Sequence, residues 1–244
     1  MKKRVLSIFL CLSMLLSLLT LASCSDKKNP PDGSGTNPPA AETESIAILY
    51  ENDVHCAVDG YSKLAAMKAE LKGVYDHVGV VSSGDFVQGG TLGAVSKGEY
   101  IVNLMNKVGY DAIALGNHEF DYQLARLVEL NNLSNTKFLS CNFAKIGEDK
   151  SYFDSYTIVS YGDVEIAYIG ITTPSTISSS NPAQFKNEDG EIIYTFNEAD
   201  MYSLVQANID SAEKAGADYV IALSHIGYSE AGDFTDITDI IENT

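Results

Sequence analysis

Short β-rich runs alternate with helical patterns of apolar residues through most of this chain. The runs at 46–50, 78–81 and 112–115 are rich in Ile, Val, Leu and Ala, and apolar residues recur at helical spacing in 64–71 and 101–108. In such a βαβαβ order the strands run parallel and the helices pack over the sheet. The alternation therefore predicts an α/β fold that begins with parallel strands.

The second half of the chain has a different pattern. The runs at 156–159 and 164–169 flank the residues Tyr161-Gly162-Asp163, which is typical of a β-hairpin with antiparallel strands. A long helical pattern at 201–212 and a further β-rich run at 219–223 follow. Together the two halves predict an α/β sandwich with a mixed sheet.

The N-terminus is predicted to be an export signal. After a cationic start, residues 5–22 are almost wholly apolar and uncharged, which is the pattern of a secretory signal. Leu21-Ala22-Ser23-Cys24 resembles the lipobox of bacterial lipoprotein signal peptides, in which the cysteine becomes the lipid-modified first residue. We expect residues 1–23 to be a signal peptide and Cys24 to anchor the exported protein to the membrane, in the cell envelope or at the cell surface. An uncleaved anchor and a buried core helix are the alternatives.

Residues 24–44 are predicted to be a tether between this lipid anchor and a folded domain at 45–244. Four of the six prolines of the chain lie in this stretch, together with glycines and small polar residues. A segment with so little apolar content cannot bury enough surface to offset the entropy lost on ordering. An ordered loop is the alternative interpretation.

The charge of the chain restricts its partners. There are 33 acidic residues against 16 Lys and Arg, for a formal net charge of -17. A surface this acidic repels the phosphate backbone, and no basic stripe offsets the repulsion, so we expect no nucleic-acid partner. If the ligand is an anion, its attraction must come from something other than cationic side chains.

Polar residues collect directly after the predicted strands. Asn52 to His55 follow the first strand, Ser83 to Asp85 the second, Gly116 to Asp121 the third, and a loop at Ser224-His225 follows the strand at 219–223. Because the carboxyl ends of parallel strands share one edge of a sheet, where ligands bind, these four stretches should converge there.

The side chains in these loops suit a pair of metal ions. Asp, Asn and His supply hard or borderline oxygen and nitrogen donors. Such donors suit Zn, Mn or Fe and do not form a soft thiolate site. Asp53 and His55 would point to one side of an extended segment, and Asp85 could bridge two ions through its two oxygens. Gly84 and Gly116 would let the backbone approach closely. Taken singly, each of these residues has an alternative structural interpretation, as a helix cap, a turn residue or a loop histidine whose hydrogen bonds are made within the protein.

These residues form a motif set that resembles the calcineurin-like metallophosphoesterases. The set is Asp53-Val54-His55, Gly84-Asp85, Gly116-Asn117-His118-Glu119 and the lone His225. The sequence segments around these motifs, such as Gly84-Asp85-Phe86-Val87-Gln88-Gly89, are similar to those of the secreted bacterial 5′-nucleotidase branch. The resemblance implies a four-layer αββα sandwich and two divalent metal ions, Zn, Mn or similar.

The resemblance also implies a role for each site residue. Asp53 and His55 would hold one ion, Asn117 and His225 the other, and Asp85 would bridge the two. His118 would be the catalytic histidine, which stabilises the phosphoryl charge or protonates the leaving oxygen.

Asp121 would fix the ring of His118, and a carboxylate is a usual partner for setting the tautomer and charge of an imidazole. An interpretation of Asp121 as the N-cap of a helix at 121–133 is compatible with this role.

The implied function is metal-dependent hydrolysis of phosphate esters outside the cytoplasm, by attack of a metal-bridging hydroxide. The small-molecule substrate would be a nucleoside 5′-monophosphate or a nucleotide sugar. A 2′,3′-cyclic nucleotide phosphodiesterase shares the same motifs. A non-catalytic, metal-binding surface lipoprotein is the alternative from another class, and it would be expected to lack His118 or Asp85.

Two departures from the family pattern bear on activity. Cys56 stands where the branch usually has Gly, and a small buried hydrophobe is the simplest interpretation of it. An adventitious metal contact or a redox-sensitive thiol beside the site is the alternative. The family's Gly-His-x-His segment and nucleobase-stacking domain do not occur before Thr244. We therefore interpret the domain as incomplete at its C-terminus and expect this chain alone to bind metal weakly and turn over slowly.

Overall fold

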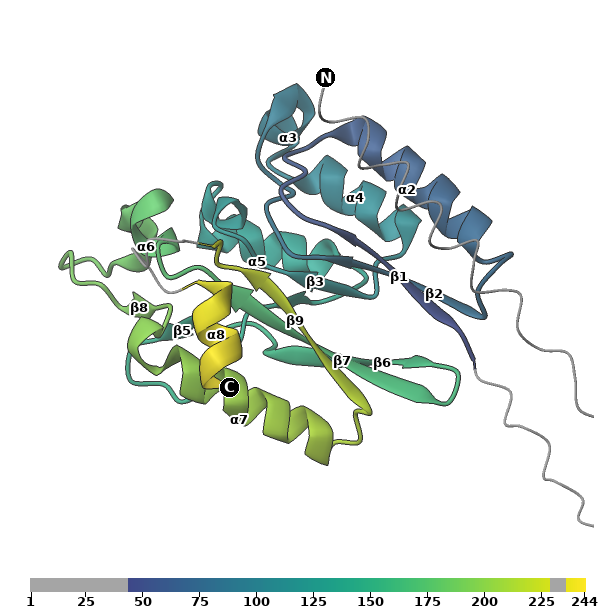
Figure 1. Cartoon of the computed structure of the whole chain (residues 1–244). Helices are drawn as coiled ribbons and strands as arrows, with labels where there is room; N and C mark the ends of the chain where they lie inside the picture. Colours follow the sequence, from purple (N-terminus) through teal and green to yellow (C-terminus); the bar gives the residue numbers. More distant parts are fainter. Residues whose placement is uncertain (1–43, 229–235) are drawn as a thin grey trace, which may run out of the picture. The chain divides into compact units, whose positions relative to one another are not determined.

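Figure 1 shows the computed structural model of the chain, which describes residues 44–228 and 236–244. The predicted signal peptide, Cys24 and nearly all of the predicted tether at 24–44 lie outside the described residues. Within these two ranges no helix is long and apolar enough to cross a membrane.

The first sheet contains four parallel strands in the order β1-β2-β3-β4. Its strands are β1 (Ile46–Glu51), β2 (His77–Ser82), β3 (Ala112–Ala114) and β4 (Phe138–Leu139). In the register of the first pair, Ile46 lies opposite His77 and Glu51 lies opposite Ser82. The parallel βαβαβ arrangement predicted from the sequence is confirmed.

Helices connect the strands of this sheet. They are α2 (Val58–Leu71), α3 (Gly90–Ser96), α4 (Glu99–Val108), the 3₁₀ turn η1 (His118–Phe120) and α5 (Leu124–Leu133). At the end of α4, Gly109 adopts φ 75° and its N–H bonds to the carbonyl of Met105, as glycine does at many helix ends. The sequence predicts a helix at 121–133. The observed helix α5 begins three residues later, at Leu124, because η1 occupies the preceding turn.

The second sheet is mixed and contains β6, β7 and β9. The predicted hairpin is confirmed, since β6 (Tyr156–Tyr161) pairs antiparallel with β7 (Val164–Thr172). After α7 (Met201–Lys214), β9 (Tyr219–His225) pairs parallel with β7. Ser224 and His225 are thus the last residues of a strand and not a loop, because the ladder continues to the pair Thr172 and His225.

Smaller elements complete the described part of the chain. The antiparallel pair β5 (Ala144–Lys145) and β8 (Tyr194–Thr195) forms a separate ribbon. The remaining elements are α6 (Thr176–Ser179), η2 (Pro182–Phe185), η3 (Glu198–Asp200) and α8 (Ile237–Asn243).

The two main sheets pack face to face, with helices on both outer faces (Figure 1). Val80 packs with the residues of α4 and α5, whereas its neighbour Val81 packs with Tyr168 between the sheets. This division follows from the period of two in a strand, which sends successive side chains to opposite faces. On the far side, Ile169 and Ile171 of β7 pack against α7. The four-layer αββα architecture is the one expected from the family resemblance, with a parallel sheet and a mixed sheet in place of one mixed sheet.

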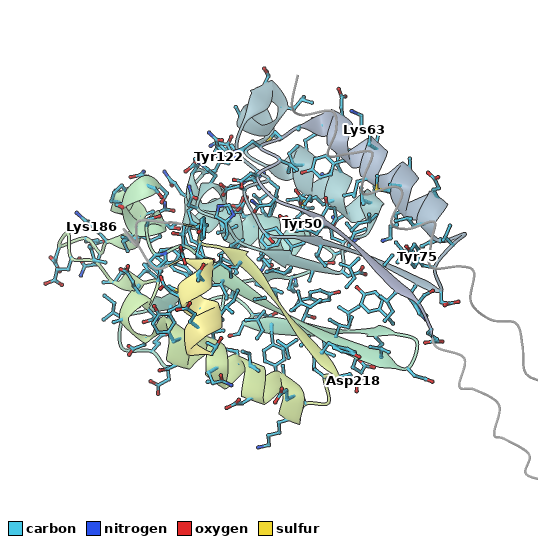
Figure 2. All side chains as sticks on the ribbon, viewed as in Figure 1. Tyr50, Lys63, Tyr75, Tyr122, Lys186 and Asp218 are labelled. Atoms are coloured by element: carbon cyan, nitrogen blue, oxygen red, sulfur yellow. The ribbon has the colours of Figure 1, made fainter. Side chains whose placement is uncertain are left out.

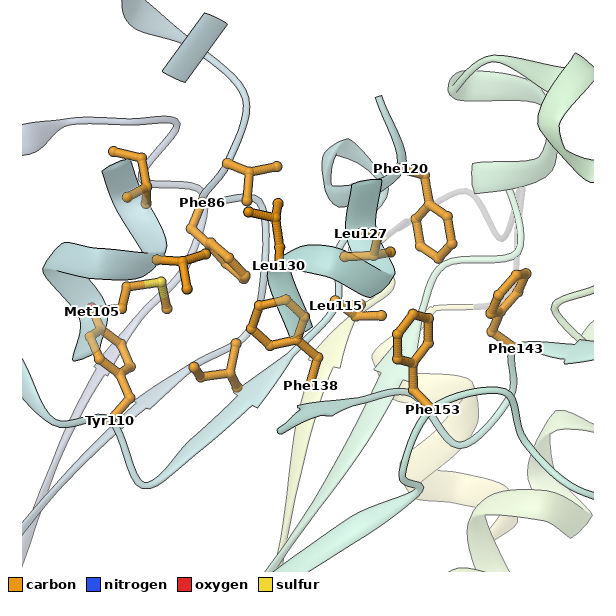
Figure 3. Packing of buried hydrophobic residues seen from close by; sticks show 14 of the residues in the cluster. Phe86, Met105, Tyr110, Leu115, Phe120, Leu127, Leu130, Phe138, Phe143 and Phe153 are labelled. Carbon is orange, nitrogen blue, oxygen red and sulfur yellow. The ribbon is translucent and has the colours of Figure 1, made fainter. Parts of the chain in front are cut away.

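Lys63 on the outer side of α2 is exposed (Figure 2). Inside, aromatic rings extend the core from Phe86 and Phe138 to Phe120 and Phe143 (Figure 3). Phe143 is fully buried, and its ring centroid lies 5.0 Å from that of Phe120 and 4.8 Å from that of Phe196. Phe143 therefore joins the turn that follows β3 to the ribbon.

We predict that Phe143→Ala lowers the free energy of unfolding by about 3 to 5 kcal/mol, because truncation removes buried area and leaves a cavity among the rings. Urea denaturation of the two proteins measures the difference. Tyr219→Ala, at a side chain that is 63% exposed, is the control and should change stability by less than about 0.5 kcal/mol. Equal effects from the two substitutions would contradict this account of the core.

Candidate functional site

The loops after β1, β2 and β3 meet the end of β9 at one edge of the sandwich. Two groups of donor atoms form there, and within each group the atoms lie within 4.8 Å of one another. Both groups include Asp85. The groups are His55, Asp85 and His118, and Asp53, Asp85 and His225.

Asp85 is the centre of the arrangement and is only 2% exposed. One carboxylate oxygen, Oδ2, lies 3.1 Å from Nε2 of His225 and 3.8 Å from Nε2 of His55. The other oxygen, Oδ1, accepts the backbone N–H of His118 at 2.8 Å. Burial alone would raise the pKa of Asp85, but the hydrogen bond and charge of His225 and the N–H of His118 lower it overall. Asp85 is therefore an ionised carboxylate that faces both groups of donors.

The loop after β1 has an unusual backbone. Asp53, His55 and Cys56 have φ values of 55°, 42° and 59°, in the left-handed region. The extended segment predicted for Asp53 and His55 is thus wrong, although Nε2 of His55 still lies 3.5 Å from Oδ1 of Asp53. Left-handed backbone costs an L-residue about 1 to 2 kcal/mol, and such strain concentrates at functional sites.

Backbone hydrogen bonds to the loop after β2 hold this conformation. The N–H of Asp53 donates to the carbonyl of Gly84 at 3.2 Å, and the N–H of His55 donates to the carbonyl of Asp85 at 2.9 Å. A third bond runs from Cys56 to Phe86 at 3.3 Å. The first two loops therefore form one unit.

The loops after β2 and β3 touch through two glycines. Gly84 has φ 106°, and a Cβ added there would lie 2.3 Å from the backbone nitrogen of Gly116. A Cβ on Gly116 would lie 2.2 Å from Oδ1 of Asp85. Side chains at these positions would push the loops apart. The two loops therefore approach each other closely, as expected from the two glycines in the sequence.

Glu119 is a structural residue to which the sequence analysis gave no role. Its carboxylate is 1% exposed and accepts four backbone N–H groups, from Asp85 and Phe86 at 2.8 Å, Val87 at 3.2 Å and Gly116 at 2.7 Å. Burial, and then the charge of Asp85, raise its pKa. Its spacing in the motif does not distinguish a buried acceptor from an exposed acid, so sequence alone gave no signal.

His118 forms a pair with Asp121. Nδ1 of His118 lies 2.7 Å from Oδ2 of Asp121. Burial opposes protonation of this imidazole, but the hydrogen bond to Asp121 and the charge of Asp85 raise the pKa of His118 overall. The interpretation of Asp121 as a helix N-cap is wrong, because Gln123 precedes α5 and Asp121 ends η1.

His225 and Asn117 line a cavity of about 470 Å³. Its side chain is 11% exposed, and Nδ1 lies 3.2 Å from Oδ1 of Asn52 and 3.1 Å from the carbonyl of Ser83. Burial lowers the pKa of His225, but the hydrogen bond and charge of Asp85 raise it overall.

The donor atoms fit divalent cations. Two carboxylates and imidazole nitrogens converge on a site of net negative charge, and this set suits Zn, Mn or similar ions. Cys56 belongs to neither donor group, and its thiol donates to the carbonyl of Val87 at 3.0 Å. Burial raises the pKa of the Cys56 thiol to about 11, which disfavours the thiolate that would bind a metal.

We predict that Glu119→Gln lowers the free energy of unfolding by at least about 2 kcal/mol, because an amide NH₂ replaces an acceptor oxygen opposite buried N–H groups. Chemical denaturation measures the loss. Glu213→Gln, at an exposed position on α7, is the matched control and should leave stability nearly unchanged. A Glu119→Gln protein as stable as the control would show that the four N–H bonds do not hold the loops.

The chain is similar in sequence to a known protein family and to several of its characterised members. The family profile described as calcineurin-like phosphoesterase matches residues 46–240. The chain is 32% identical over 215 residues to the snake venom 5′-nucleotidase of Gloydius brevicauda, an alignment that covers 78% of this chain and 34% of that protein. It is 30% identical over 203 residues to protein UshA of Escherichia coli, with 79% and 36% covered.

The fold is also found in a solved structure. The crystal structure of the calcineurin-like phosphoesterase YfkN from Bacillus subtilis aligns with a TM-score of 0.68 at 22% identity, over 82% of this chain and 69% of that one. The chain spans about a third of the length of the curated relatives that it matches.

Proposed function

The chain belongs to the calcineurin-like phosphoesterase family, and we propose that it hydrolyses phosphate esters with two divalent metal ions. One observation carries the proposal: buried Asp85 is shared by two groups of donors, beside a histidine that a carboxylate orients. A structural or purely binding role requires no such histidine next to the shared carboxylate.

From the family pattern we assign one ion to Asp53 and His55 and the other to Asn117 and His225, with Asp85 serving both. The two donor groups of the structure pair the residues differently, because they place Asp53 with His225 and His55 with His118. When bound, two divalent ions would supply the positive charge that attracts a phosphate to this acidic chain, and they would lower the pKa of a water molecule. The strained loop after β1 and the buried bonds of Asp85 hold the carboxylates in place before an ion binds.

We assign His118 to the leaving group. Its Nδ1 is engaged by Asp121, so Nε2 is the nitrogen that remains to donate a proton or to stabilise the phosphoryl charge. The bond from the backbone N–H of His118 to Asp85 positions the His118 backbone beside the metal donors. Asp121 both orients this imidazole and stabilises its protonated form.

The proposed substrate is a nucleoside 5′-monophosphate or a nucleotide sugar. Relatives from snake venom, Bos taurus and Vibrio cholerae bear the name 5′-nucleotidase, which supports a nucleotide ester. Export and lipid anchoring through Cys24 are proposed from the sequence alone. Parallel assays with adenosine 5′-monophosphate and a 2′,3′-cyclic nucleotide would separate the two esterase activities.

We predict that Mn²⁺ raises the thermal midpoint of the wild-type chain and that Asp85→Asn removes this rise. A ligand at 100 times its Kd adds about 2.7 kcal/mol to stability. For a domain of this size, that corresponds to roughly 5 to 10 °C. Differential scanning fluorimetry with and without Mn²⁺ measures the effect, and Asp163→Asn in the β6–β7 turn is the control. A full Mn²⁺ shift in Asp85→Asn would rule out the bridging assignment.

We predict that kcat/KM falls as the pH rises through the raised pKa of His118, because the reaction needs this imidazole protonated. Asp121→Asn removes a charge that raises this pKa, so the fall should move to lower pH. His118→Asn should lower turnover by about 10² to 10⁴ while the Mn²⁺ shift persists. The measurement is the pH profile of phosphate release, and a basic limb unmoved by Asp121→Asn would contradict the role of the pair.

A further inference from the structure

The two histidines assigned to the metal ions share a feature at the nitrogen that faces away from Asp85. Nδ1 of His55 lies 3.2 Å from the side-chain oxygen of Gln88 and 3.3 Å from the Gln88 carbonyl. Nδ1 of His225 lies 3.2 Å from the side-chain oxygen of Asn52 and 3.1 Å from the Ser83 carbonyl. Each ring thus faces one side-chain amide and one backbone carbonyl.

This pairing decides which nitrogen can bind a cation. Amide and carbonyl oxygens only accept hydrogen bonds, so Nδ1 must carry a proton to satisfy them. The lone pair of Nε2 is then available for a cation, on the side where Nε2 of both rings approaches Asp85. His118 differs, because its Nδ1 meets the charged carboxylate of Asp121.

Asn52 has a second contact that Gln88 lacks. Its amide nitrogen donates to Oδ2 of Asp53, while Oδ1 of Asp53 faces His55. Asn52 therefore contacts one ligand assigned to each ion, whereas Gln88 contacts a ligand of one ion only. The donor contact to Asp53 also fixes the orientation of the amide, since a carboxylate accepts from NH₂ and not from an amide oxygen.

We propose that Gln88 and Asn52 are positioning residues for the metal pair, with Gln88 serving one ion through His55 and Asn52 serving both ions through Asp53 and His225. This inference rests on the proposed metal site. Gln88 needs only a hydrogen-bond acceptor for Nδ1 of His55. Asn52 needs both a donor for Asp53 and an acceptor for Nδ1 of His225.

Isothermal titration of the full chain with Mn²⁺ tests the proposal. Partners that orient metal ligands typically contribute 10- to 100-fold in affinity. We expect Gln88→Ala to weaken one of two bound ions by this factor and Asn52→Ala to weaken both. Gln206→Ala, at a half-buried position on α7 that contacts none of the metal donors, is the matched control and should bind like wild type.

Conversion of each amide to a carboxylate separates positioning from a general effect on structure. Gln88→Glu keeps an acceptor for Nδ1 and should bind both ions within about threefold of wild type, in contrast with the loss expected in Gln88→Ala. Asn52→Asp loses the donor and places a second negative charge beside Asp53, so it should stay weakened like Asn52→Ala. Thermal unfolding without metal should be similar for all the Gln88 variants.

Each outcome bears on a different step. Equal binding by wild type, Gln88→Ala and Asn52→Ala would overturn this inference and leave the proposed function standing. Loss in both Gln88 variants would also overturn it, because the acceptor would then not suffice. A wild-type chain that binds no Mn²⁺ would overturn the metal site itself, and this inference with it.

Discussion

The bonds to the carboxylate of Glu119 hold the site together. Its two oxygens accept N–H groups from the loop after β2, at Asp85, Phe86 and Val87, and from Gly116 after β3. Because a buried N–H group without a partner is costly, these four donors fix the two loops relative to each other. Asp85 owes its position to this arrangement, and the donors from β1 and β9 are arranged around Asp85.

Left-handed backbone and small residues gather at the edge where these loops meet. Gly84 and Gly116 touch where no Cβ would fit, and Asp53, His55 and Asp85 all have positive φ. The sheets and helices beneath are regular and densely packed, so they can hold an unfavourable loop conformation in place. Such a preorganised edge suits chemistry in which charged ligands must be held close together before an ion neutralises them.

The sequence pattern predicted the architecture more accurately than it predicted the local backbone. The parallel strands, the hairpin at 156–169 and the last strand all formed, because their apolar periodicity decides which faces are buried. The extended loop at Asp53 and the N-cap at Asp121 were wrong. The loop at Asp53 depends on hydrogen bonds to residues about 30 positions away, and the conformation at Asp121 depends on a 3₁₀ turn. Apolar periodicity encodes neither of these.

By itself the sequence determined the fold class and the strand ends that carry the polar residues, since parallel strands place their carboxyl ends at one edge of the sheet. Only the tertiary structure decided which atoms face one another. It showed that Asp85 lies between two histidines, that Glu119 is buried and bonded to the Asp85 backbone, and that Asn52 and Gln88 contact the far nitrogens of the rings. The reason is physical: side-chain direction depends on backbone angles and distant hydrogen bonds, and a linear pattern of residues specifies neither.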